Sequence, residues 1–302
     1  MEIRWIAVFT AMLVGFGCSH SVPKRDPLPA ADKHEVDNRY VYTSCKVDEA
    51  KKRVLFWQKR AADRVYLYAL MSSNAYTDEK QYEIPGWTRT DRFSSTSGLA
   101  FDEYVRDGSS PLELVVAFRG TERSLKDWKA NAALIEPWQH REAYEYIARR
   151  RKEQPDAHMT VTGHSLGGAL ALNMSTRFDN LPAFAFNSSP RAFFAAQGIA
   201  NERTLVWETG EILNSVRRPW LGARMRDAER LRFNFMSYRI FRSLKFIREH
   251  GIYGLSRGLL ISAVAYGNPH AKEVFDANIL QAGVPAAEIE ACEVLPAQAP
   301  PP

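Results

Sequence analysis

A serine flanked by glycines is the part of the sequence best suited to chemistry. Residues 163–167 read Gly-His-Ser-Leu-Gly, the G-x-S-x-G pattern in which a serine stands on a sharp turn between a strand and a helix. The residues 159–162, Met-Thr-Val-Thr, predict a short strand, and the residues from 166 to about 177 predict the helix. The two glycines leave room for the strained backbone of such a turn. Ser165 is therefore the candidate nucleophile for attack on an ester carbonyl.

Apolar runs elsewhere predict the elements that must position this serine. Strands are expected at 112–118, 183–187 and 204–207, and helices within 47–76 and at 142–151. Strands that alternate with helices indicate a parallel sheet. We therefore expect an α/β fold with a mostly parallel central sheet and helices on both faces.

Four segments resemble the class 3, or fungal-type, lipase family. They are 163–170 (the nucleophile segment), 115–121 followed by Asp127-Trp128 and Asn131 (the oxyanion strand and the start of the lid), 69–76 (an N-terminal helix) and 188–191 (a Ser-Pro-Arg turn). The resemblance covers residues 64–274, and its motifs occur in the family's order. It implies an α/β-hydrolase fold and a serine ester hydrolase acting on lipid acyl esters.

The remaining members of a catalytic triad should follow the serine in the order acid, then histidine. By resemblance, Glu211 takes the position where the family has an aspartate before an aliphatic pair, with Glu208 and Asp227 as alternatives. His250 resembles the family's histidine before a terminal amphipathic helix, and His270, after a Gly-Asn-Pro turn, is the alternative. The sequence thus predicts a Ser-His-Glu triad.

The negative oxygen of the tetrahedral intermediate requires backbone N–H donors, one of which follows the nucleophile. Leu166 supplies that donor, and the resemblance places the second at Thr121. His250 would take the proton from Ser165, Glu211 would hold the imidazole, and water would hydrolyse the acyl-enzyme.

Metal chemistry is not expected, because no His, Cys and acidic residues have metal-ligand spacing. We predict no cofactor. His164, inside the serine motif, is interpreted as a packing residue rather than as a catalytic one.

The N-terminus has the pattern of an export signal. A charged lead and an apolar run precede Cys18, which predicts that 1–18 is a signal peptide of the lipoprotein type and that Cys18 becomes lipidated. We expect 19–45 to be a linker or N-terminal arm, 46–294 the lipase-like domain and 295–302 a disordered tail. The predicted location is the cell envelope, at the outer membrane or the periplasmic face, with secretion as the alternative.

The formal charge of +5 is concentrated in one stretch between the candidate acid and histidine. Its basic residues are Arg217, Arg218, Arg224, Arg226, Arg230, Arg232, Arg239, Arg242, Lys245 and Arg248. We interpret the stretch as a helical segment with a basic face. Such a face at the mouth of the site would suit anionic phospholipid and favours phospholipase A1 activity, whereas a solvated helix face explains the same charges. Nucleic acid is not an expected partner.

Three questions stay open at this stage. Cys45 and Cys292 either form a disulfide or remain free thiols. The fold could serve a non-catalytic, lipid-binding envelope lipoprotein. The same triad could also transfer the acyl group to an alcohol instead of to water.

Overall fold

The computed structural model describes residues 49–76, 81–120, 137–189, 199–208, 228–233 and 251–278 of the 302-residue chain. Its elements are α2 (Glu49–Asn74), β1 (Trp87–Ser94), β2 (Ala100–Arg106), β3 (Glu113–Phe118), α4 (Pro137–Glu153), β4 (His158–His164), α5 (Leu166–Ser175), β5 (Ala183–Phe186), β6 (Arg203–Glu208), β7 (Glu229–Phe233), α8 (Ile252–Tyr266) and α9 (Pro269–Asn278). The predicted signal peptide with Cys18, the cysteines Cys45 and Cys292, and the predicted tail lie outside the described residues.

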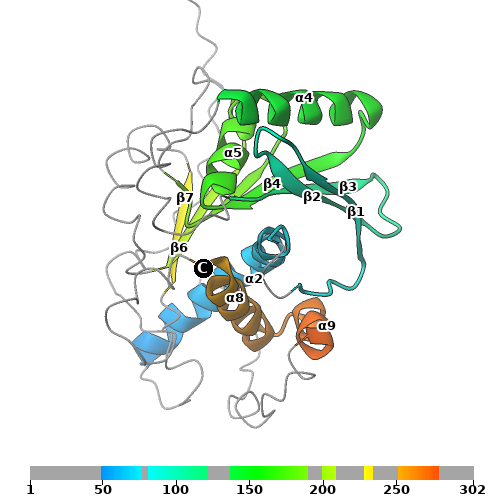
Figure 1. The fold of residues 1–302 in the computed structure, drawn as a ribbon. Coiled ribbons are helices and arrows are strands. Elements are labelled where there is room, and N and C mark those ends of the chain that lie inside the picture. The colour runs from blue at the N-terminus through cyan, green and yellow to red at the C-terminus, as the bar shows by residue number, and fades with distance from the viewer. Residues whose placement is uncertain are drawn as a thin grey trace, which may run out of the picture. The chain divides into compact units, whose positions relative to one another are not determined.

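The seven strands form one sheet whose spatial order is their order in the chain, β1 to β7 (Figure 1). β1, β2 and β3 pair antiparallel, and β3 to β7 pair parallel. In the register, Phe118 at the end of β3 lies beside Gly163, and Phe186 at the end of β5 lies beside His164. The carboxyl ends of β3, β4, β5 and β6 therefore meet at one edge of the sheet, directly before the turn that carries Ser165.

Helices cover both faces of the sheet, with α4 and α5 on one and α2 and α8 on the other (Figure 1). Alternate residues of β4 reach the two faces. Val161 belongs to the core that includes Ile147 of α4 and Leu170 of α5, whereas the Thr162 hydroxyl lies 2.9 Å from the Ser72 hydroxyl of α2. This arrangement confirms the predicted α/β-hydrolase fold.

One expectation about the basic stretch at 217–248 is wrong. We expected a helical segment, but Glu229–Phe233 is strand β7, paired with β6. Leu231 and Phe233 are buried, whereas Arg232 between them is only partly buried and Arg230 is exposed, a period-two pattern typical of a strand. The rest of the stretch lies outside the described residues.

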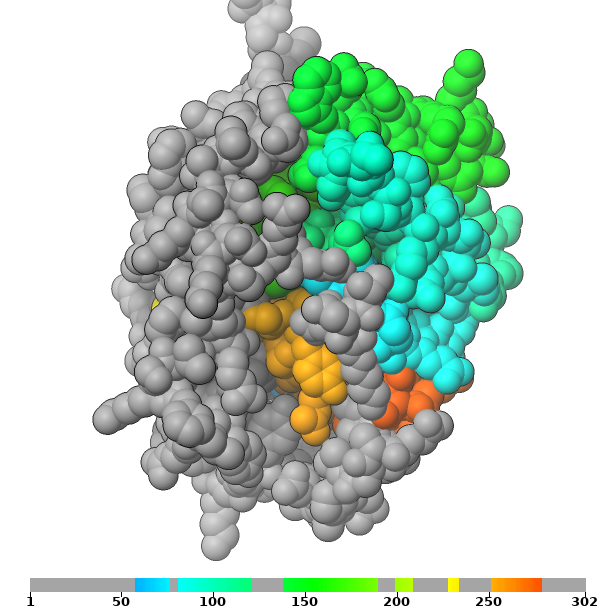
Figure 2. All heavy atoms as spheres, in the orientation of Figure 1, coloured from blue at the N-terminus to red at the C-terminus, as the bar shows by residue number. Residues whose placement is uncertain are grey.

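The antiparallel edge was not predicted. β1 is largely exposed along its length, and the segment 81–106 reaches the surface together with α8 and α9 (Figure 2). Of the helices described, none is both long and apolar enough to cross a membrane.

Candidate active site

The backbone of Ser165 is held in a conformation that L-residues rarely adopt. Its φ is 54° and its ψ is −119°, between the last residue of β4 and the first of α5. Its N–H donates to Phe186 O at 3.0 Å, and its carbonyl accepts from the N–H groups of Ala169 (3.2 Å) and Ser189 (2.9 Å). The side chain makes no capping hydrogen bond to α5 and is partly exposed. Strain of this kind persists only where the surroundings fix it, and it is concentrated at functional sites.

The glycines of the motif are required by close packing. A Cβ on Gly163 would lie 2.4 Å from the carbonyl carbon and oxygen of Gly167. A Cβ on Gly167 would lie 2.1 Å from Phe118 O, in the backbone of β3. One at Gly168 would lie 3.1 Å from the Cβ of Ser188. The turn can therefore lie against β3 only if Gly163 and Gly167 have no side chain, and a side chain at Gly168 would require Ser188 to shift by a few tenths of an ångström.

We expect Gly167→Ala to lower the free energy of unfolding by about 2 kcal/mol or more, because the new methyl group meets rigid backbone. Gly254→Ala is the matched control. Gly254 lies in helix α8 with nothing within 4 Å of an added Cβ, so this change should stabilise the protein by about 0.5–1 kcal/mol. Chemical denaturation of the purified variants measures both. Equal stability of the two variants would show that the turn can relax.

The first predicted oxyanion donor, Leu166, is the first residue of α5. N–H groups in the first turn of a helix have no acceptor within the helix, and the helix dipole adds positive potential there. The end of β3 also lies close to the nucleophile, since a Cβ on Gly120 would be 3.2 Å from the Cβ of Ser165. Thr121, the second predicted donor, is the next residue and lies outside the described residues.

Of the three acid candidates, the structure describes Glu208, at the carboxyl end of β6. Glu208 is the last residue of this strand and is buried. Asn187, with a φ of 41°, accepts the Glu208 N–H on its Oδ1 at 2.9 Å and donates its own N–H to Val206 O at 2.8 Å. It therefore fixes the start of the segment that leads to Glu211. Glu211 and Asp227 lie outside the described residues. The sequence analysis did not single out Asn187, although an asparagine directly after a strand is a common signal for a left-handed turn residue.

The alternative histidine, His270, is held by structural contacts. Its Nδ1 lies 2.6 Å from the Tyr66 hydroxyl, and its Nε2 lies 2.8 Å from Pro85 O. Burial raises the pKa of Tyr66 above its ordinary value, so the phenol stays protonated and donates to Nδ1. Tyr66 lies eight residues before the end of α2, which corresponds to about 12 Å along the helix axis. The preferred histidine, His250, lies outside the described residues, and its role stays a prediction.

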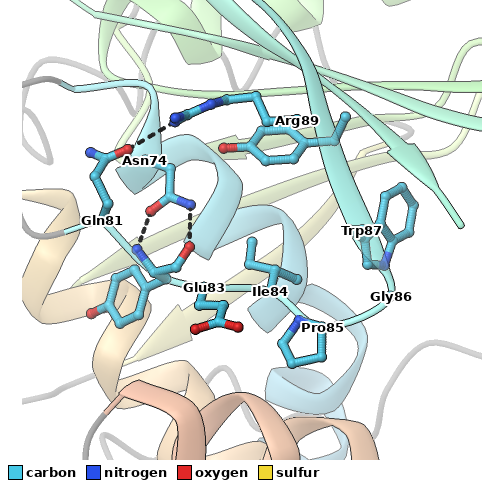
Figure 3. A pocket seen from close by; sticks show the side chains of 10 residues that line it. Asn74, Gln81, Glu83, Ile84, Pro85, Gly86, Trp87 and Arg89 are labelled. Carbon is cyan, nitrogen blue, oxygen red and sulfur yellow. Dashed lines mark hydrogen bonds between the residues drawn. The ribbon is translucent and has the colours of Figure 1, made fainter. Parts of the chain in front are cut away.

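An open pocket of about 330 Å³ lies beside β1 and the segment before it (Figure 3). Within its lining, the Asn74 side chain pairs with the backbone of Tyr82, and Arg89 donates to Gln81. None of the predicted site residues lines it. Among the described residues there is also no group of three His, Cys, Asp or Glu side chains placed to bind a metal ion.

About half of the chain is similar in sequence to a known protein family. Residues 59–205 match a family model described as "Phospholipase-like: Tle-like phospholipase domain". The chain contains a lipase/phospholipase-like domain. The match to this phospholipase-like domain includes the segment of Thr121 and the turn of Ser165, and it ends before Glu208. It agrees with the lipase resemblance predicted from the sequence.

Solved structures with a similar backbone include three fungal lipases. Lipase II from Rhizopus niveus is 20% identical, with a TM-score of 0.37 over 54% of this chain and 77% of that one. The Rhizomucor miehei lipase in its propeptide complex is 19% identical, with a TM-score of 0.36 over 59% and 66%. A triacylglycerol lipase from Penicillium expansum is 21% identical, with a TM-score of 0.36 over 49% and 71%. No curated protein matches the chain.

Proposed function

We propose that the protein is a serine carboxylic-ester hydrolase that acts on lipid acyl esters. The observation that carries the proposal is the strained, partly exposed Ser165 on a strand-to-helix turn, within a domain that matches a phospholipase-like family. A buried glycine-lined turn with an inert serine would have no need of this backbone strain.

The proposed mechanism uses the predicted triad. His250 takes the proton from Ser165 Oγ as the oxygen attacks the ester carbonyl, and Glu211 stabilises the imidazolium. The N–H groups of Thr121 and Leu166 bind the oxyanion. The alcohol leaves with the proton from His250, and a water molecule then hydrolyses the acyl-enzyme by the same steps.

A feature at the start of α4 supports a lipid substrate. Trp138 is 52% exposed, and the guanidinium of Arg141 lies 4.6 Å from the centre of its ring. Gln139 donates to Ser97 O in the turn between β1 and β2, which lies level with the carboxyl end of β3. An exposed tryptophan beside a cation at this edge suits the boundary between acyl chains and head groups.

The test is hydrolysis by the purified protein of a short-chain p-nitrophenyl ester, a triglyceride emulsion and phospholipid vesicles, side by side with labelling by a fluorophosphonate probe. We expect labelling, hydrolysis of all three, and the highest rate on anionic phospholipid, with release of the sn-1 acyl chain. The absence of both labelling and hydrolysis would favour the lipid-binding alternative. Acyl transfer to an added alcohol in preference to water would favour the acyltransferase.

The basic stretch accounts for the expected charge preference. Each exposed Lys or Arg near an anionic bilayer adds about 1 kcal/mol of attraction, which salt screens. Rates on anionic vesicles should therefore exceed those on zwitterionic ones and fall as salt rises. Replacing Arg217, Arg218 and Arg224 together with Gln should remove the preference and leave hydrolysis of the soluble ester unchanged. Equal rates on both vesicles would point to a neutral lipid.

A further inference from the structure

A buried tyrosine connects the two sides of the candidate active site. Tyr76 follows the end of α2, and its hydroxyl lies 2.8 Å from His164 Nδ1. The same oxygen accepts the N–H of Gly120 at 3.0 Å. Tyr76 is 7% exposed and His164 is 4% exposed, and their rings meet edge-on with centroids 5.6 Å apart. One phenol oxygen thus bonds two segments that are 44 residues apart in the sequence.

The two partners of this oxygen are the neighbours of the residues expected to do the chemistry. His164 directly precedes Ser165, and Gly120 directly precedes Thr121. Gly120, Tyr76 and His164 are closely packed, because a Cβ on Gly120 would lie 2.4 Å from the Tyr76 hydroxyl and 2.8 Å from His164 O. Tyr76 therefore adds a side-chain bridge between the residue before Thr121 and the residue before Ser165.

We propose that Tyr76 is a positioning residue: its hydroxyl, bonded to Gly120 N–H and to His164, fixes the end of β3 beside Ser165, where the oxyanion forms. The proposal rests on the proposed function. Tyr76 acts through the backbone of Gly120 and does not touch the substrate. An oxyanion donor is effective only within a few tenths of an ångström of its ideal position, and an error of about 1 Å can cost about 100-fold in rate.

The test is Tyr76→Phe in the full-length protein, assayed on a soluble p-nitrophenyl ester. The ring still fills its site, but Gly120 N–H and His164 lose the oxygen that joins them. We expect kcat to fall by about 10- to 100-fold with KM within about twofold of the wild type, since the oxyanion exists only after the substrate is bound. The pH at which kcat/KM is half-maximal should not move, because the proton acceptor is untouched.

Tyr104→Phe is the matched control. Tyr104 is also buried and donates to Asp102 at 3.2 Å, on a strand of the antiparallel edge. Loss of the Tyr104 hydroxyl should leave kcat unchanged and alter only the thermal midpoint. Equal losses of kcat in both variants, in step with lost stability, would overturn the proposal, as would a Tyr76→Phe protein with wild-type kcat. In either case an active wild type leaves the proposed function standing, whereas an inactive wild type removes both.

Discussion

Ser165→Ala is expected to lower kcat for ester hydrolysis by about 10³- to 10⁶-fold, because no other group in the proposed mechanism can form the acyl-enzyme. Alanine keeps the Cβ and removes only the oxygen, so the backbone strain at φ 54° is nearly unchanged. The thermal midpoint should therefore stay close to that of the wild type. Steady-state kinetics on a soluble ester and a melting curve measure both quantities.

A Ser165→Ala protein that keeps more than about a tenth of the wild-type rate would refute the serine mechanism. Gly254→Ala, which changes a residue on an open part of α8, is a suitable comparison for nonspecific effects on activity. The fluorophosphonate probe gives an independent readout, since the label should be absent from the Ser165→Ala protein and present on the Gly254→Ala protein.

The second large effect is expected for His250→Ala, which should lower kcat as far as Ser165→Ala does. The double variant should be no worse than either single one, because residues that act as a unit are not additive. His270→Ala should instead keep kcat and lose about 1–3 kcal/mol of stability, since the Tyr66 hydroxyl and Pro85 O lose their shared partner. If His270→Ala lost its kcat and His250→Ala kept it, the proton acceptor would be His270 and not His250.

Most of the parallel half of the sheet could be predicted from the sequence, because β3, β5 and β6 contain short apolar runs, whereas β7, whose residues include three charged side chains, was expected to be helical. The run predicted at 183–187 is β5 (Ala183–Phe186), and the run at 204–207 lies within β6 (Arg203–Glu208). Strands covered by helices on both faces have this pattern. The serine turn could be predicted for a related reason, since its glycines are required by contacts that are local in sequence.

The antiparallel edge could not be predicted, because its strands do not look apolar. β2 contains two adjacent carboxylates, Asp102 and Glu103, that are nearly fully buried. They are tolerated because arginines pair with them: Arg92 with Asp102, and Arg150 with Glu103, each at 2.8 Å. Buried charges need such partners, and those partners lie on another strand and on a helix, which no local pattern reveals.

The proposed positioning residue, Tyr76, and its partner His164 were missed for a similar reason. Tyr76 was part of a segment recognised for its resemblance, and His164 was interpreted as packing. Their importance depends on Gly120, a residue distant in sequence that donates to the phenol oxygen. Only the fold brings these three residues together.

The strand order has a consequence for folding of the protein. Because each strand pairs with the next in the chain, the sheet can grow one strand at a time from its N-terminal edge, while α2 covers one face. The outer side of α2 stays uncovered until α8 packs against it. Leu255 and Leu259 of α8 are fully buried in the folded protein. An unfinished chain would expose this apolar surface and depend on chaperones. The proposed proton acceptor, His250, lies two residues before α8, so a partly folded chain would contain the nucleophile before the group proposed to activate it is in place.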